Sequence, residues 1–296
     1  MGAGRRWGGR CGLPEGRRVR VAKDGIQVRF WGVRGSIACP GDSYVRYGGN
    51  TACVEMRCGP HLLIFDGGTG LRELGRTLEG APPLDVDIFF SHSHLDHVAG
   101  VPFFKPLFAA QNKFRLWAGH LKPERTLMDV LCQMMAAPLF PIPPAAFDAD
   151  TEFNDFTAGE RLEPHPGVTL ATAPLNHPNG ATGYRVGFNG RAVAYVTDTE
   201  HEKGRLDSNI LRLIEGADLF IYDSTYTEHE YPAYAGWGHS TWQQGLRLAE
   251  AGGVKRFVIF HHDPSHDDLF MDAIAAEAER LRPGTVVARE GMLISL

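Results

Sequence analysis

The chain lacks any apolar run close to the roughly 20 residues that a membrane-spanning helix needs. Its Arg-rich N-terminus also lacks the apolar core of about 7–15 residues that marks a signal peptide. Only five of the 296 residues are cysteines, and no two form a C-x-x-C pair. A disulfide framework and a cysteine zinc site are therefore disfavoured, and we expect a cytoplasmic protein without membrane contact.

Positive charge is scarce in most of the chain. The formal net charge is −5, but residues 1–26 hold seven basic and two acidic residues, so residues 27–296 carry −10. Long nucleic acids are bound by basic surfaces that displace counterions. The sequence therefore argues against a long nucleic-acid partner and leaves room for a small ligand held by metals.

The patterning predicts one folded domain, 26–296, after a disordered Arg/Gly-rich tail, 1–25. Alternating strand patterns fill the front of this domain, and strands alternate with helices behind, as in layered α/β proteins. Asn189-Gly190 predicts a hairpin turn. Helices are expected over 123–136 and 268–281.

Residues 137–166 are rich in Pro and Phe at their start and show no clear period. This composition favours a loop or a lid over a site more than core. Two roles for residues 137–147 are equally compatible with the sequence. They could stack on a base of the substrate, or they could form a core or dimer contact.

The strongest chemical signal is His92-Ser93-His94-Leu95-Asp96-His97, directly after the apolar strand pattern Val86–Phe90. Imidazole suits Zn, Fe or Mn, and a carboxylate adds a hard oxygen ligand. In an extended backbone His92 and His94 point the same way, whereas Asp96 and His97 lie beyond the bend. One loop would then supply ligands to two neighbouring ions.

This segment resembles the H-x-H-x-D-H signature of the metallo-β-lactamase superfamily. Five further stretches resemble that family's motifs in the same order: Phe65-Asp66-Gly67-Gly68, Leu175-Asn176-His177-Pro178, Val196-Thr197-Asp198-Thr199, Gly238-His239-Ser240-Thr241 and Phe260-His261. The resemblance covers nearly all of 26–296 and implies a four-layer αββα sandwich.

The resemblance also implies two divalent metal ions, with Zn, Mn and Fe all compatible. Ligands of the first ion would be His92, His94, His177 and Asp198. Ligands of the second would be Asp96, His97, His261 and the bridging Asp198. His262 competes with His261 for the last position, and we prefer His261 because it directly follows the apolar strand.

His239 occupies the chain position at which ribonuclease Z-like enzymes keep a proton donor, and Asp223 matches the acidic partner of that histidine. The resemblance thus implies a catalytic set of His239, Asp223 and Asp96. Helix capping at Ser240, with His239 merely nearby, is the simpler alternative. For Asp66 we expect a role in orienting a histidine, with capping of the following helix as its alternative.

The stretches Phe30–Ser36 and Tyr47–Thr51 resemble the phosphodiesterase branch near ribonuclease Z and the cyclic-phosphate phosphodiesterases. The long Gly/Pro-rich basic arm with which ribonuclease Z grips tRNA is missing. The resemblance therefore implies hydrolysis of a small phosphodiester substrate, a cyclic nucleotide or cyclic phosphate ester, by a metal-bridging hydroxide. Alternatives are an acyl hydrolase (lactone, thioester or lactam), a ribonuclease Z-like nuclease, and a binding or redox protein; a homodimer is also open.

Overall fold

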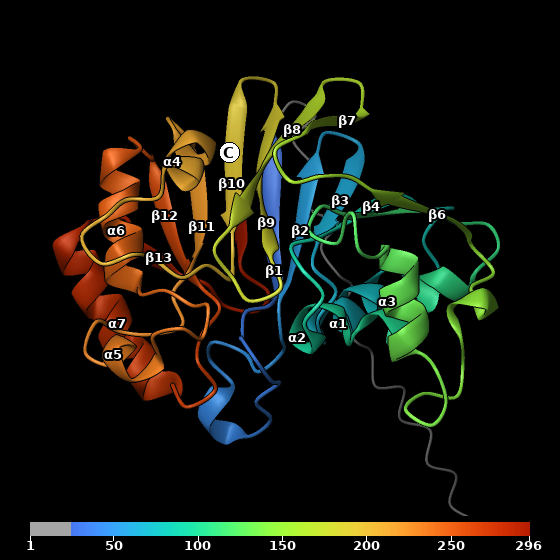
Figure 1. The fold of residues 1–296 in the computed structure, drawn as a ribbon, viewed down its shortest axis with the longest axis horizontal. Coiled ribbons are helices and arrows are strands. Elements are labelled where there is room, and N and C mark those ends of the chain that lie inside the picture. Colours follow the sequence, from blue (N-terminus) through green and yellow to red (C-terminus); the bar gives the residue numbers. More distant parts are fainter. Residues whose placement is uncertain (1–24) are drawn as a thin grey trace, which may run out of the picture.

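Two seven-stranded sheets form the centre of the molecule (Figure 1). The computed structural model describes residues 25–296, so the predicted tail lies outside the described residues except for Gly25. The first sheet consists of β1 (Ile26–Gly32), β2 (Cys53–Cys58), β3 (His61–Phe65), β4 (Asp85–Phe90), β5 (Lys113–Ala118), β6 (Asp150–Asp155) and β14 (Leu293–Ser295). Their order in the sheet is β14-β1-β2-β3-β4-β5-β6.

The second sheet is built from the later part of the chain. Its strands are β7 (Arg161–His165), β8 (Val168–Leu175), β9 (Ala181–Phe188), β10 (Arg191–Val196), β11 (Leu219–Asp223), β12 (Arg256–Phe260) and β13 (Val286–Val287). They are ordered β13-β12-β11-β10-β9-β8-β7. Apolar side chains from both sheets, among them Phe65 and Ile221, are buried together in the core between them.

Helices cover the outer face of each sheet. The first sheet is covered by α1 (Gly70–Thr77), α2 (Leu95–Val98) and α3 (Leu127–Met134), which contribute Leu71, Val98 and Leu131 to one outer core. The second sheet is covered by α4 (Ser208–Ile214), α6 (Trp242–Ala251) and α7 (Asp268–Leu281), and the short α5 (Tyr231–Tyr234) precedes α6. The predicted αββα sandwich is therefore confirmed. No helix within 25–296 combines the length and apolarity needed to cross a membrane.

Two local predictions were wrong in part, because one helix begins later than expected and one segment expected as a loop contains two strands. The helix expected over 123–136 begins only at Leu127, because Thr126 and Asp129 form a capping box at that point. Residues 137–166, expected as a loop or lid, contain the strands β6 and β7. Each pairs with a neighbour, β5 or β8, at the edge of a sheet. Tertiary pairing thus overrides a weak local pattern.

Strand direction gathers the candidate residues at one edge of the sandwich. Strand β3 is parallel to β4, and β10, β11 and β12 are parallel to one another. The loops after these strands carry Asp66, the His92–His97 segment, Asp198 and His261, and Asp223 ends β11. In Figure 1 this edge lies toward the bottom, where α1 and α2 follow β3 and β4.

Candidate metal centre

Three of the candidate residues leave their strands through an unusual backbone conformation. Asp66, Asp198 and His261 have φ values of 61°, 55° and 64°, in the left-handed region that residues other than glycine rarely adopt. Asp66 and His261 directly follow the buried ends of β3 and β12, and Asp198 lies two residues after the end of β10. Strain of this kind is concentrated at functional sites, where the surrounding structure holds it in place.

His92, His94 and His177 form the first group of converging side chains. Their candidate ligand atoms all lie within 4.8 Å of one another. Nε2 of His177 is 3.0 Å from Nδ1 of His94, and Oδ1 of Asp198 lies 3.7 Å from Nε2 of His92 and 3.9 Å from Nε2 of His177. Nε2 of His92 is buried and has no hydrogen-bond partner among residues 25–296. A buried imidazole nitrogen in this position is suited to a metal.

Asp96, His97, Asp198 and His261 form the second group. Nε2 of His97 lies 3.2 Å from Nε2 of His261 and 3.2 Å from carboxylate oxygens of Asp96 and Asp198. Nε2 of His261 is 3.3 Å from the same two oxygens. Four ligands at about 2.0–2.1 Å around a tetrahedral ion are separated by about 3.3–3.4 Å. The spacing of these side-chain atoms therefore fits a divalent ion.

The charges in the second group also favour a cation. Asp96 and Asp198 are buried, and within residues 25–296 neither forms a salt bridge with a lysine or arginine. Burial raises the pKa of Asp198, but the imidazoles of His261 and His97 outweigh it and hold that pKa well below its ordinary value. Burial keeps the pKa of His92 well below its ordinary value, so its ring stays neutral, the form that binds metals.

Each of three histidines is oriented by a partner on Nδ1, which directs Nε2 toward the groups described above. Asp66 lies 2.9 Å from Nδ1 of His97. The carbonyl oxygen of Gly238 accepts from Nδ1 of His177 at 2.7 Å. The Thr225 hydroxyl donates to Asp223, and its oxygen lies 3.0 Å from Nδ1 of His261. Such partners fix the tautomer and the ring orientation of metal-binding histidines.

His239 and Asp223 meet beside the second group. Nδ1 of His239 lies 3.1 Å from Oδ2 of Asp223 and 3.7 Å from Oδ1 of Asp198. Burial alone lowers the pKa of His239, but the charge of Asp223, its hydrogen bond and the charges of Asp198 and Asp96 raise that pKa to about 9. Capping of α6 is carried out by Thr241, not Ser240, so the capping alternative does not explain His239.

His261 and His262 both follow the end of β12 at Phe260, but their side chains have different surroundings. His261 belongs to the second group. His262 is buried elsewhere, with Nε2 2.9 Å from the carbonyl oxygen of Ala288. The geometry therefore favours His261 over His262 as a ligand.

Sequence reasoning missed several residues whose side-chain or backbone groups lie at or near this centre. Thr225 follows Asp223 in a polar run after a buried strand, and this position in the sequence is the signal that points to it. The backbone N–H of Ser36 donates to Oδ2 of Asp96 at 2.7 Å, and the ring centroid of His120 lies 6.5 Å from that of His92. Gly238 acts through its backbone carbonyl group. Every residue has such a group, so the residue type does not reveal this role.

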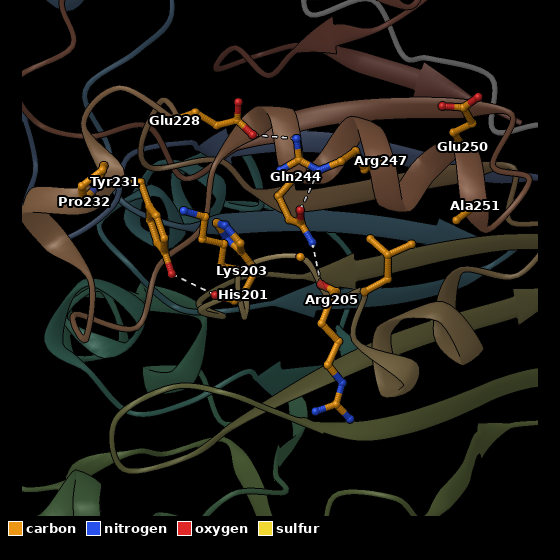
Figure 2. A pocket seen from close by; sticks show the side chains of 12 residues that line it. His201, Lys203, Arg205, Glu228, Tyr231, Pro232, Gln244, Arg247, Glu250 and Ala251 are labelled. Atoms are coloured by element: carbon orange, nitrogen blue, oxygen red, sulfur yellow. Dashed lines mark hydrogen bonds and ion pairs between the residues drawn. The ribbon is translucent and has the colours of Figure 1, made fainter.

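A separate cavity of about 810 Å³ lies beside α6 (Figure 2). Its wall includes His201, Tyr231, Gln244 and Arg247, and none of the seven candidate ligands lines it. In the wall of this cavity, the Tyr231 hydroxyl donates to the carbonyl oxygen of His201 at 2.8 Å, as the dashed line in Figure 2 shows.

The fold and the cluster of histidines and aspartates define an αββα-sandwich protein with a candidate site for divalent metals. A family model described as a beta-lactamase superfamily domain matches residues 61–262, so the chain belongs to the β-lactamase superfamily. A divalent metal site is a property of this fold family that the His/Asp cluster fits.

Related sequences carry the name ribonuclease Z. The protein of Brevibacillus brevis is 31% identical over 103 residues, which is 33% of this chain and 31% of that one. The chain thus matches about a third of that relative's length. The protein of a Bradyrhizobium species is 25% identical over 292 residues, covering 83% of this chain and 90% of the relative.

Solved structures support the same fold. The metallo-beta-lactamase fold protein YhfI from Bacillus subtilis has a TM-score of 0.68 and 18% identity, covering 93% of this chain and 100% of that one. Zinc-bound PqqB from Methylobacterium extorquens has a TM-score of 0.66 at 18% identity and covers 91% and 100%. A diphosphatase of the PhnP family has a TM-score of 0.65 at 18% identity and covers 92% and 97%.

Proposed function

We propose that the protein is a metal-dependent phosphodiesterase that hydrolyses a small cyclic nucleotide or cyclic phosphate ester. The observation that carries the proposal is the hydrogen-bonded pair of Asp223 and His239 beside the two ligand groups. The ribonuclease Z names of the related sequences and the diphosphatase among the solved structures support phosphoester chemistry.

We infer that the two ligand groups bind two divalent ions. His92, His94 and His177 would hold one, Asp96, His97 and His261 the other, and Asp198 reaches toward both. Bound there, divalent ions would supply an activated water molecule and offset negative charge on the phosphoryl oxygens.

The chain's own residues supply the proton for the leaving group. Asp223 accepts the N–H of His239 at Nδ1 and thereby leaves Nε2 as the atom that donates to the leaving oxygen. Asp223 is fully buried and also accepts from the backbone N–H of Thr199 and Thr225, so the pair is rigidly oriented. A P–O bond to a poor alkoxide leaving group gains most from such an acid.

The acidic body supports a small substrate. Residues 27–296 carry a formal charge of −10, which disfavours a long polyanion. A small ester needs only the metals and a few neighbouring side chains for binding.

The first test compares substrate classes with Mn²⁺- or Zn²⁺-loaded protein. We expect hydrolysis of bis-p-nitrophenyl phosphate and of at least one cyclic nucleotide in a panel of 2′,3′- and 3′,5′-cyclic phosphates. Hydrolysis of nitrocefin or a thioester instead would establish an acyl hydrolase. Cleavage of a tRNA precursor with no turnover of cyclic phosphates would establish a nuclease and overturn the small-substrate proposal.

The second test addresses His239. His239→Ala should slow esters with alkyl leaving groups about 10²–10⁴-fold, the usual contribution of a general acid. Esters of p-nitrophenol, whose leaving group needs no proton, should change far less. Equal losses for both ester types would remove the acid role.

A further inference from the structure

The loop between α5 and α6 supplies two groups to the centre. The Gly238 carbonyl oxygen holds Nδ1 of His177, and the next residue is His239. Gly238 has a φ of 87°, and a Cβ atom built on it would lie 2.4 Å from Nδ1 of His177, so the loop backbone is in tight contact with that imidazole. The position of this loop therefore sets both the orientation of His177 and the place of His239.

The carboxylate of Glu200 accepts two hydrogen bonds from the backbone of the loop. Oε1 of Glu200 accepts the N–H of Gly236 at 2.7 Å, and Oε2 accepts the N–H of Gly238 at 2.8 Å. The Tyr231 hydroxyl approaches Oε1 at 3.3 Å. Hydrogen bonds from backbone N–H groups to an ionised carboxylate are among the stronger ones in proteins.

Glu200 is itself tied to the chain beside His177. Its backbone N–H donates to the carbonyl oxygen of Asn176 at 2.7 Å, and Nδ2 of Asn176 donates to the carbonyl oxygen of Glu200 at 2.9 Å. Glu200 also lies two residues after Asp198. One residue thus connects three segments, which carry Asp198, His177 and His239.

We propose that Glu200 is a positioning residue that, through the backbone of Gly236 and Gly238, orients His177 toward the metal and places His239 beside Asp223. The part that concerns His239 rests on the proposed function, whereas the part that concerns His177 rests only on metal binding. Glutamine at this position has one acceptor oxygen, and its amide NH₂ would face one of the two backbone N–H donors. The loop then loses one of its two bonds.

The experiment compares E200Q with E202Q. Glu202 lies on the same segment, is exposed and pairs with Arg205, so the control removes the same charge outside the network. Affinity for Zn²⁺ is measured by competition with a chelator, and the Nδ1–H signal of His177 is followed by ¹⁵N-histidine NMR of the zinc-loaded protein. We expect E200Q to lose about 10–100-fold in zinc affinity and to exchange the His177 proton faster, with E202Q unchanged.

A kinetic readout addresses His239. E200Q should lower turnover of alkyl-leaving-group esters more than that of p-nitrophenyl esters, and E202Q should lower neither. Zinc affinity and His177 exchange equal to those of E202Q would overturn the proposal. Should no phosphodiester be hydrolysed at all, the proposed function fails, while the zinc and NMR results still decide the role of Glu200.

Thermal unfolding of both variants shows whether E200Q folds. If it does not, E200D is used, because its carboxylate is one methylene shorter and cannot reach both backbone N–H groups. Reduced zinc affinity in folded E200D supports the proposal, and wild-type affinity together with wild-type His177 exchange overturns it.

Discussion

Oδ2 of Asp66 lies 2.9 Å from Nδ1 of His97, and both side chains are fully buried. The same carboxylate accepts from the Tyr195 hydroxyl at 2.7 Å and from the backbone N–H of Ser91 at 2.7 Å. Asp66 thus joins the loop after β3, the loop after β4 that carries the candidate ligands and a tyrosine of β10. The sequence-based expectation that Asp66 orients a histidine agrees with this geometry.

Asp66→Asn is predicted to weaken metal binding about 10–100-fold, the usual effect of losing a partner of a metal-binding histidine. The amide cannot accept from His97, Ser91 and Tyr195 at once. Chelator competition measures the change, and Tyr195→Phe, which removes one donor and leaves the carboxylate, should bind metal nearly as well as the wild type. Equal affinities in D66N and the wild type would contradict this role.

The neighbouring histidines 261 and 262 should respond differently to replacement. His261→Ala should remove a ligand of the second group and reduce the metal content of the purified protein. His262→Ala should keep the metal but lower stability, because the Ala288 carbonyl oxygen loses its buried partner, at a cost of about 1–3 kcal/mol. Metal analysis and urea unfolding of both variants check this, and the reverse pattern would assign the ligand to His262.

Asp87 is predicted to be a major stabilising residue away from the metal centre. This fully buried carboxylate accepts from Arg115 at 2.8 Å, from Nε1 of Trp117 at 2.8 Å and lies 2.6 Å from Nε2 of His165. Asp87→Ala leaves Arg115 without its buried partner and should cost about 3–5 kcal/mol in urea unfolding. Asp85→Ala, which removes an exposed partner of the same arginine, should cost under about 1 kcal/mol. Similar losses of unfolding free energy in both variants would contradict the larger role of Asp87.

His120 should make the stability of the protein depend on pH. Burial, with the nearby charges of His94, His97 and His177, lowers its pKa to about 4. The unfolded chain, with a pKa near 6.5, therefore binds more protons between pH 6.5 and 4, and stability falls as the pH falls through this window.

His120→Asn should remove this contribution. Among residues 25–296, Nδ1 of His120 is buried without a hydrogen-bond partner and Nε2 has one hydrogen bond, to the Ser93 hydroxyl, so little is lost at neutral pH. Between pH 7 and pH 4.5 the wild type should lose on the order of 2 kcal/mol more than the variant, measured by urea unfolding at both values. Parallel losses in the two proteins would show that His120 does not titrate in this way.

Local patterns in the sequence were sufficient for much of the fold. Asn189 and Gly190 adopt φ values of 46° and 75°, as the predicted hairpin turn requires. The last helix spans Asp268–Leu281 as expected. These features depend on neighbours in the chain, so local rules apply to them. The edge strands β6 and β7 were missed because their pairing partners lie elsewhere in the sequence.

The sequence alone determined which residues could bind metal, because the spacing of His92, His94, Asp96 and His97 is a local property of one loop. Only the tertiary structure decided that His261 rather than His262 turns toward them, since this depends on the left-handed backbone at a strand end in the other sheet. It also decided that Glu200 holds the loop of Gly238. Backbone N–H and carbonyl groups are present in every residue, so their partners are fixed by how the sheets and loops pack and not by residue type.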